Sequence, residues 1–324
     1  MKAAVYYQTG RPDVFRYEEV PDPVVRPGGI VFDVRAISIE GGDVLNRAGG
    51  AMITNPHIVG YQAAGIVQEV GDGVVSFAPG QRVVATMPFG SHASLASVPA
   101  RSAYALPENM DLALAACVPI AFGTAHDCLF EFGRLKAGET VLVQAAAGGV
   151  GLAAVQLAKR AGARVLGTAS SDEKLERLRA FGLDLGINYR TSHTAAAVMA
   201  ATDGQGVNLV VDSVGGHTLE QSIACLAYRG RLSWVGNAGR EQYTPVVSGL
   251  MQKNARLNGI YLGGELTERP DRTRAMIGAL LADCATGALK VVVDRTFPLS
   301  EAAAAHAYIE SRSAFGRVVL VPEH

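Results

Sequence analysis

The stretch from Val141 to Gly151 constrains the fold of this chain more than any other. Its apolar start, Val141–Val143, predicts a buried strand, and three of the four residues 148–151 are glycine. Apolar residues then recur every three or four positions up to Ala161, which is typical of a helix packed on one face. A strand, a glycine turn and a helix together open a dinucleotide-binding fold. The stretch therefore predicts an α/β domain with a parallel sheet.

The glycine turn itself predicts contact with phosphate. The spacing G-x-G-x-x-G occurs as Ala146, Gly148 and Gly151, with alanine in the first place. Such a turn lets a pyrophosphate approach the backbone, and the following helix N-terminus offers N–H groups and partial positive charge. We expect Gly148, Gly149, Val150 and Gly151 to bind a dinucleotide cofactor.

Composition excludes several classes of protein. The 324 residues are 49% hydrophobic and 18% charged, which is typical of a globular chain long enough for two domains. The net charge of −1 gives no electrostatic footprint for nucleic acid or an anionic membrane. We see no signal peptide and no transmembrane span. The cysteines Cys117, Cys128, Cys225 and Cys284 are scattered, so a disulfide framework and a cysteine zinc site are not indicated, and a cytoplasmic location is expected.

The pattern of elements changes along the chain. Up to about residue 120, short strand-like runs are separated by Pro and Gly turns, which favours a small barrel or sandwich. From about Gly138, strands and helices alternate, which predicts a parallel sheet with helices on both faces and a last strand at 255–261. The tail after residue 262 continues neither pattern.

Beyond these patterns, the chain resembles a known family along its whole length. The matching segments are Ile37–Asp43, Val59–Gly65, Gly71–Val74, Pro79–Val83, the glycine turn, Ile187–Arg190, Val211–Gly215, Phe297–Leu299 and Gly316–Leu320. The chain is similar to the zinc-free quinone oxidoreductases, which include zeta-crystallin, within the medium-chain dehydrogenase/reductase superfamily. The resemblance implies a doubly wound Rossmann sheet inserted into a chaperonin-10-like catalytic barrel, with the active site in the cleft between them. We expect a catalytic barrel domain at 1–122, an NADP-binding Rossmann domain at 123–262 and a return to the catalytic domain at 263–324.

A bound zinc ion is not expected. Zinc alcohol dehydrogenases of this superfamily carry Gly-His-Glu where this chain has Gly60, Tyr61 and Gln62, and Tyr and Gln are poor ligands for zinc. His57 and His92 lack a thiolate or carboxylate at ligand spacing. Without a metal to polarise an alcohol or ketone, hydride transfer to an electron-poor quinone or activated enone is the feasible reaction.

The residues after the second strand of the glycine-turn domain favour NADPH over NADH. Ser170 and Ser171 stand where NAD-specific sites carry a carboxylate, and neutral hydroxyls accept a 2′-phosphate without repulsion. Lys174 adds a cation one turn on. In related reductases, the matching Lys and the Tyr corresponding to Tyr189 contact the 2′-phosphate or adenine. Asp172 remains an alternative that would serve NAD if it turned inward.

The same serines have a structural interpretation. Ser170 with Glu173 forms a capping-box pattern, and Asp172 suits a helix N-terminus. Capping and phosphate binding are compatible at one helix start, so both interpretations stay open.

Further contacts are expected at the carboxyl ends of the fourth and fifth strands, where ligands of open α/β sheets bind. We expect the ribose and nicotinamide to meet Ser213, Val214, Gly236, Asn237 and Ala238, unless these segments are simple turns. The resemblance adds Thr124 near the nicotinamide ribose, with a buried capping role as the alternative. It also adds Arg317 as a basic residue near the cleft, with a solvated strand-start charge as the alternative.

One loop departs from the family. Relatives usually carry Asn where this chain has Glu40, and an ionised Glu cannot donate a hydrogen bond to a carbonyl oxygen. Glu40 therefore stays protonated, pairs with Arg47 or another cation, or favours a different substrate. Tyr61 is the other candidate donor to the acceptor, with a packed aromatic ring as its alternative. We take Glu40 and Tyr61 as the candidate catalytic residues.

These observations predict a zinc-independent NADPH reductase of a quinone or activated enone. The enzymic alternative is a 2-enoyl thioester reductase, and the non-enzymic alternative is an NADPH-binding protein with a vestigial catalytic cleft. A homodimer is expected because relatives pair the strand corresponding to 255–261 across a two-fold axis.

Overall fold

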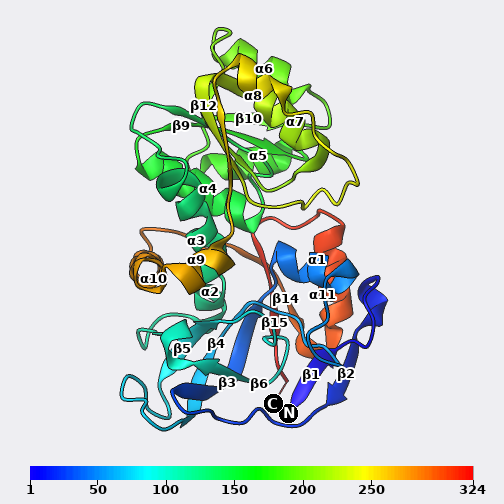
Figure 1. Cartoon of the computed structure of the whole chain (residues 1–324), viewed down its shortest axis with the longest axis vertical. Coiled ribbons are helices and arrows are strands. Elements are labelled where there is room, and N and C mark those ends of the chain that lie inside the picture. The colour runs from blue at the N-terminus through cyan, green and yellow to red at the C-terminus, as the bar shows by residue number, and fades with distance from the viewer. Residues whose placement is uncertain (324) are drawn as a thin grey trace. The chain divides into compact units, whose positions relative to one another are not determined.

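A six-stranded parallel sheet forms the centre of one of the two units of the chain in the computed structural model, which describes residues 1–323. We call this contiguous segment, Ala121–Pro270, the Rossmann unit (Figure 1). The strands follow the order β10-β9-β8-β11-β12-β13. Their bounds are β8 Thr140–Val143, β9 Arg164–Ala169, β10 Leu185–Asn188, β11 Val207–Asp212, β12 Leu226–Trp234 and β13 Arg256–Gly259.

Helices connect the parallel strands of the Rossmann unit. They are α4 Gly149–Arg160, α5 Asp172–Arg179, α6 Thr194–Ala201, α7 Gly216–Cys225 and α8 Ser248–Gln252. A further helix, α9 Leu262–Glu268, follows the last strand. On one face, Leu142 of β8 and Val210 of β11 pack in a buried cluster with Val198 of α6 and Leu219 of α7. Since successive strand side chains point to opposite faces, Val141 and Val143 are buried on the other face. From β8, the chain adds β9 and then β10 on one side of the sheet. It then returns and adds β11 on the other side of β8, so the direction in which strands are added reverses between β8 and β11. Open sheets bind ligands at such a reversal.

A mixed sheet forms the second unit, Met1–Ile120 together with the residues from Asp271 onward, which we call the barrel unit. Its strand order is β14-β15-β3-β4-β5-β7, with β6 also paired to β3, and β1 and β2 form a separate hairpin pair. The bounds are β1 Lys2–Val5, β2 Arg16–Glu19, β3 Gly29–Ser38, β4 Gln62–Val70, β5 Arg82–Thr86, β6 Leu95–Pro99, β7 Ala103–Ala105, β14 Val293–Pro298 and β15 Arg317–Val321. The last strand β15 pairs antiparallel with β3, so the chain's end completes a sheet begun near its start.

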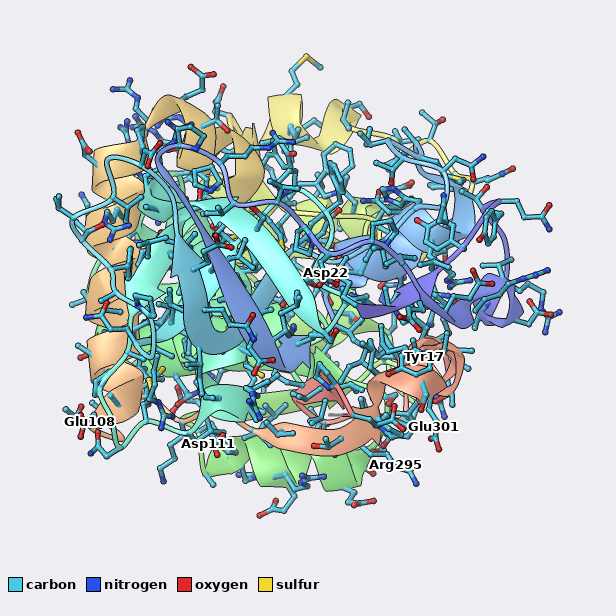
Figure 2. The ribbon with its side chains drawn as sticks, turned by 90° about the horizontal axis from the view of Figure 1, so that it is seen from below. Tyr17, Asp22, Glu108, Asp111, Arg295 and Glu301 are labelled. Atoms are coloured by element: carbon cyan, nitrogen blue, oxygen red, sulfur yellow. The ribbon has the colours of Figure 1, made fainter. Side chains whose placement is uncertain are left out.

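Five helices belong to the barrel unit or to its junctions with the Rossmann unit. They are α1 Gly41–Gly49, α2 Leu112–Ala116, α3 Pro119–His126, α10 Pro270–Ala285 and α11 Ala302–Glu310. Asp111, labelled in Figure 2, caps α2 by accepting a hydrogen bond from the Leu114 N–H at 3.0 Å. A π-helical turn, Asp127–Glu131, extends α3. Short 3-10 turns occur at Pro12–Val14, Ala100–Ser102 and Leu299–Glu301. No helix within residues 1–323 combines the length and apolar composition needed to cross a bilayer.

The structure differs from the sequence-based expectations in three places. Helix α1 was not expected, because glycines at 41, 42 and 49 hide its pattern. The units divide at 120/121 and 270/271, whereas boundaries at 122/123 and 262/263 were expected. The expected capping box of Ser170 and Glu173 was wrong, because α5 begins one residue later and Ser171 is its N-cap.

Candidate functional site

The glycine turn after β8 is tightly folded around Ala145. Ala145 has a positive φ of 50°, and its carbonyl accepts a hydrogen bond from the Gly148 N–H at 2.9 Å. Gly148 is the extended N-cap of α4, so the first helical N–H groups belong to Gly149, Val150 and Gly151. The first N–H groups of a helix have no intrahelical partner, which suits them to an anion.

Gly151 is required by close contact between α4 and the turn. A Cβ atom at Gly151 would lie 2.3 Å from the Ala145 carbonyl oxygen and 2.7 Å from the Ala146 Cα atom. Both are backbone atoms that cannot rotate away. A Cβ atom at Gly148 would lie 3.3 Å from the same oxygen, a milder contact.

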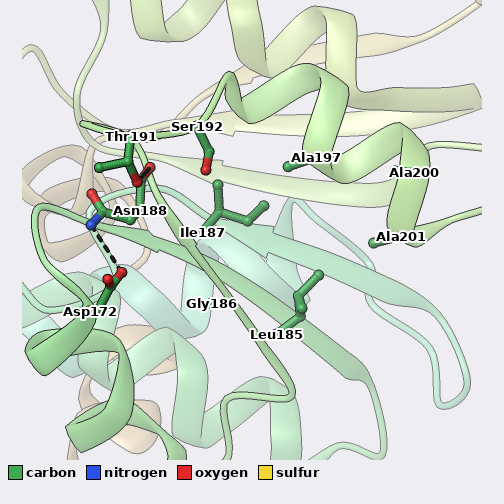
Figure 3. A pocket seen from close by; sticks show the side chains of 10 residues that line it. All are labelled: Asp172, Leu185, Gly186, Ile187, Asn188, Thr191, Ser192, Ala197, Ala200 and Ala201. Atoms are coloured by element: carbon green, nitrogen blue, oxygen red, sulfur yellow. Dashed lines mark hydrogen bonds between the residues drawn. The ribbon is translucent and has the colours of Figure 1, made fainter.

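The end of β9 presents hydroxyls rather than a free carboxylate. The Ser171 hydroxyl accepts from the Lys174 N–H at 3.3 Å, and Ser170 precedes it outside α5. The neighbouring Asp172 carboxylate accepts from the Asn188 side-chain amide at 3.0 Å (Figure 3). Tyr189 follows β10 with 39% of its surface exposed.

A hollow of about 480 Å³ lies along β10 and α6 (Figure 3). Its lining comprises Asp172, Leu185, Gly186, Ile187, Asn188, Thr191, Ser192, Ala197, Ala200 and Ala201. Asp172 follows the carboxyl end of β9, and Asn188, Thr191 and Ser192 lie at or just after the carboxyl end of β10. The glycine turn does not contribute to this hollow.

The loops after β11 and β12 are joined by backbone hydrogen bonds. The Ser213 carbonyl accepts from the Ala238 N–H at 3.0 Å, and the Val214 carbonyl accepts from the Gly239 N–H at 2.9 Å. These bonds bring Ser213 and Val214 beside the segment Gly236–Ala238. The side-chain oxygen of Asn237 is buried and has no hydrogen-bond partner among the described residues. A buried acceptor of this kind is costly unless a ligand or water satisfies it, so these loops fit a hydroxyl-bearing or amide-bearing cofactor.

Glu40 lies in a buried polar cluster of the barrel unit. Its Oε1 atom accepts hydrogen bonds from the Gln62 amide at 2.5 Å and from the Arg317 guanidinium. Burial raises the pKa of the Glu40 carboxyl, and Arg317 opposes that shift. Arg317 also donates to the Ser38 hydroxyl at 2.7 Å and to the Ile39 carbonyl at 2.8 Å. Arg317 is thus the cation that forms an ion pair with Glu40, and only 7% of the Arg317 surface is exposed.

The suggested pairing of Glu40 with Arg47 is wrong. Arg47 donates to the Gly10 carbonyl and to the Glu310 carboxylate instead. Arg47 is on the last turn of α1, two turns from its N-cap Glu40, so its guanidinium reaches α11 rather than the helix start.

Tyr61 is held next to the same helix. Its hydroxyl accepts from the Asn46 side-chain amide at 2.6 Å. Its ring packs so closely on α1 that a Cβ atom at Gly42 would lie 2.5 Å from a ring carbon. A phenol hydroxyl can both donate and accept hydrogen bonds. Thr124, in α3, is buried and belongs to the Rossmann unit.

The Gln62 side chain is engaged at both ends. Its amide nitrogen donates to Glu40, and its oxygen accepts from the Ile120 N–H at 3.0 Å. Within residues 1–323, no three His, Cys, Asp or Glu side chains gather in a way that suits a metal ion. His92 contacts His306 through their Nε2 atoms at 3.1 Å, and burial lowers the pKa of His92 to about 3.

Comparisons with known proteins agree with this architecture. The model for the alcohol dehydrogenase GroES-like domain matches residues 26–108, and that for the zinc-binding dehydrogenase matches residues 149–282. The chain is 35% identical to a 2-haloacrylate reductase of Burkholderia sp, with 99% of each chain covered. It is 34% identical to a quinone oxidoreductase of Pseudomonas aeruginosa, with 97% of each covered. The crystal structure of Escherichia coli quinone oxidoreductase complexed with NADPH matches with a TM-score of 0.93 and 32% identity, covering 99% of this chain and 100% of that one.

A GroES-like unit interrupted by a parallel dinucleotide-binding sheet defines an oxidoreductase of the medium-chain dehydrogenase/reductase superfamily. Within that superfamily, the chain belongs to the quinone oxidoreductase family.

Proposed function

We propose that the chain is an NADPH-dependent, zinc-independent reductase that delivers hydride to a quinone or to the β-carbon of an activated alkene. The observation that carries this proposal is the corner between β9 and α5. Ser170 and Ser171 provide uncharged hydroxyls there, and Lys174 lies in the first turn of α5. The Asp172 carboxylate accepts a hydrogen bond from the Asn188 side-chain amide. The two hydroxyls and the lysine are groups that suit a 2′-phosphate at this corner.

Several groups of the Rossmann unit fit NADPH, the cofactor whose nicotinamide ring supplies the hydride. The N–H groups of Gly149, Val150 and Gly151 lie at the start of α4, where a helix offers them to an anion, and would hold the pyrophosphate. Tyr189 would flank the adenine, and Ser213 and Val214 would hold the nicotinamide ribose. The unpartnered Asn237 oxygen would accept from a cofactor hydroxyl or amide. Thr124 belongs to the same proposed set, as do Gly236 and Ala238.

The acceptor is proposed to be a small electron-poor molecule. A relative named as a quinone oxidoreductase supports a quinone acceptor, and one named as a 2-haloacrylate reductase supports an activated alkene. Hydride arrival places negative charge on the acceptor oxygen, and a hydrogen-bond donor there lowers the barrier. Tyr61 is the proposed donor, because a phenol can donate a hydrogen bond and the Asn46 side-chain amide holds its hydroxyl in place. Glu40 is proposed as the second catalytic residue at the acceptor end of the site, where it forms an ion pair with Arg317.

Zinc independence rests on the chemistry of the residues at 61 and 62. A phenol and an amide are poor zinc ligands, and both ends of the Gln62 amide already have protein partners. Metal analysis of protein purified without chelator should find less than stoichiometric zinc, with activity unchanged by dialysis against a chelator. One tightly held zinc ion per chain would refute zinc independence.

We also propose that two copies of the chain associate through β13. This strand is at an edge of the parallel sheet, so one side of its backbone is unpaired within its own sheet. Large apolar side chains are exposed on or near this edge, namely Tyr228, Trp234, Met251 and Tyr261. An apolar edge of this kind is typically covered by a partner.

The test of the proposed reaction is steady-state oxidation of NADPH with three panels of acceptors: quinones, activated enones or haloacrylates, and enoyl thioesters. We expect turnover with a quinone or an activated alkene. Turnover restricted to enoyl thioesters would replace the proposal with an enoyl thioester reductase. Tight NADPH binding without oxidation by any panel would identify an NADPH-binding protein instead.

A further inference from the structure

Four buried side chains of the Rossmann unit form one continuous chain of hydrogen bonds beneath the glycine turn. The Ala145 N–H donates to the Thr168 hydroxyl at 3.1 Å. The Thr168 hydroxyl donates to the Gln144 side-chain oxygen at 2.7 Å, and the Gln144 amide nitrogen donates to the Ser222 hydroxyl at 3.0 Å. The Ser222 hydroxyl donates to the Asp212 carboxylate at 2.7 Å. We call this chain of contacts the relay.

The two ends of the relay determine the direction of every bond in it. A backbone N–H can only donate, and an ionised carboxylate can only accept. If the Gln144 amide were reversed, its oxygen would take the Ser222 proton, and the Asp212 oxygen would face a hydroxyl oxygen without a hydrogen. The orientation of the Gln144 amide is therefore dictated by its surroundings. Since the four side chains are at most 3% exposed, each bond lost would leave a buried polar group unsatisfied.

The relay joins two loops that come from distant parts of the sequence. At one end, Thr168 also accepts the Ala146 N–H with its own carbonyl at 2.8 Å, so it holds both residues that begin the glycine turn. Ala145 has a positive φ, a conformation that is unfavourable for a non-glycine residue and so needs support.

At its other end, the relay reaches the loop after β11. The second Asp212 oxygen accepts the N–H groups of Val214 at 2.8 Å and Gly215 at 2.9 Å. Asp212 thereby shapes the turn that contains Ser213 and Val214. Ser222 belongs to α7, which this same turn leads into, so the relay also fixes the helix against the end of β8.

We propose that Thr168, Gln144 and Ser222 are positioning residues that hold the pyrophosphate-binding turn and the nicotinamide-ribose loop in a fixed relation to each other. The three side chains act through the backbone and do not touch the cofactor. This inference rests on the proposed binding of NADPH by the two loops. Fixing both loops before binding avoids the ordering cost that a flexible site would incur.

The test compares Ser222→Ala with Ser233→Ala. Ser233 is a matched control, because its hydroxyl is also fully buried in the Rossmann unit but donates to the Cys128 carbonyl at 2.7 Å, outside the relay. The affinity for NADPH is measured by fluorescence titration, and that for adenosine 2′-monophosphate by competition. Thermal melting reports the stability lost in each variant. The nucleoside monophosphate reaches the adenine and 2′-phosphate end of the site but neither loop joined by the relay.

We expect Ser222→Ala to weaken NADPH binding roughly 2- to 10-fold, the range typical of one hydrogen bond, and Ser233→Ala to leave it unchanged. Binding of adenosine 2′-monophosphate should be unchanged in both. Thr168→Val should match Ser222→Ala, and Thr168→Ser, which keeps the hydroxyl, should bind NADPH as the parent chain does. The double variant Thr168→Val/Ser222→Ala should be no weaker than the more affected single variant, since one break already interrupts the relay.

Equal effects of Ser222→Ala and Ser233→Ala on NADPH binding would overturn the inference. So would a parallel loss of adenosine 2′-monophosphate binding, or a double variant whose effect is the product of the two single effects. If the parent chain binds NADPH but the variants give any of these contrary results, the proposed function stands and only the inference about the relay is rejected. A parent chain that does not bind NADPH would reject both.

Discussion

Replacing Gly151 by alanine should damage both stability and cofactor binding, because the added methyl group has no room. It would lie 2.3 Å from the Ala145 carbonyl oxygen, and 2.7 Å and 2.9 Å from the Ala146 Cα and carbonyl carbon. Non-bonded atoms pack best near 3.5–4.0 Å, so α4 must move about 1 Å away from the turn. Overpacking of this kind typically costs about 1–3 kcal/mol of unfolding free energy.

The same movement would carry the N–H groups at the start of α4 away from the pyrophosphate. One charge-assisted hydrogen bond is worth about 1.5–3 kcal/mol, so losing one corresponds to a roughly 10- to 150-fold weaker affinity for NADPH. For a unit of this size, the stability loss should lower the melting temperature by roughly 2–12 °C.

Differential scanning calorimetry and NADPH titration measure the two effects of Gly151→Ala. The control is Gly278→Ala in α10, where an added Cβ atom would meet nothing within 4 Å. That variant should be neutral or stabilised by up to about 1 kcal/mol, because alanine favours a helix. If Gly151→Ala melts and binds NADPH like the parent chain, the argument from close backbone contact is refuted.

Three further expectations follow from the site and the sheet edge. Lys174→Ala should weaken NADPH binding by roughly 10- to 150-fold, the equivalent of one charged contact, while NADH binding stays nearly unchanged; equal weakening of both would make Lys174 structural. Because burial holds the pKa of Glu40 above its ordinary value, folding favours its protonated form, and this contribution to stability is lost as pH rises through the folded-state pKa. We also expect kcat/KM to fall over the same pH range, because an ionised Glu40 cannot donate a hydrogen bond to the acceptor. Glu40→Gln should remove the pH dependence that Glu40 gives to both the unfolding free energy and kcat/KM. Superimposable kcat/KM profiles of the parent chain and the variant would leave Glu40 a structural residue. Sedimentation should find a dimer that Tyr261→Asp weakens, and a parent chain that sediments as a monomer at every concentration would rule out pairing through β13.

Much of the fold could be predicted because its signals are local. The apolar run at Val141–Val143 and the glycines after it predict β8 and α4, and the structure confirms both to within one residue. The edge position of the strand expected at 255–261 is also confirmed, as β13. Strong periodicity and turn residues determine such elements whatever their tertiary partners are.

The contacts that organise the candidate site could not be predicted in the same way. Arg317 meets Glu40 across 277 positions of the sequence, and no local pattern selects it over Arg47. Gln144 and Ser222 are single polar residues in otherwise apolar or helical stretches, and only the parallel pairing of β8 with β11 brings them together. A polar residue directly after an apolar strand, as Gln144 is, was the one available signal.

The division of the barrel unit into two segments also governs the order in which the molecule can be made. The Rossmann unit is one uninterrupted stretch, so all of its strands exist before the residues from Asp271 onward are synthesised. At about 5–20 residues per second, the 46 residues that separate the Rossmann unit from β15 take about 2–9 s, and until then β3 lacks the strand that covers one of its edges. β15 also carries Arg317, the arginine that pairs with Glu40. The sheet of the barrel unit therefore cannot be completed until the whole Rossmann unit has been synthesised, whereas every strand of the Rossmann sheet precedes β15 in the sequence.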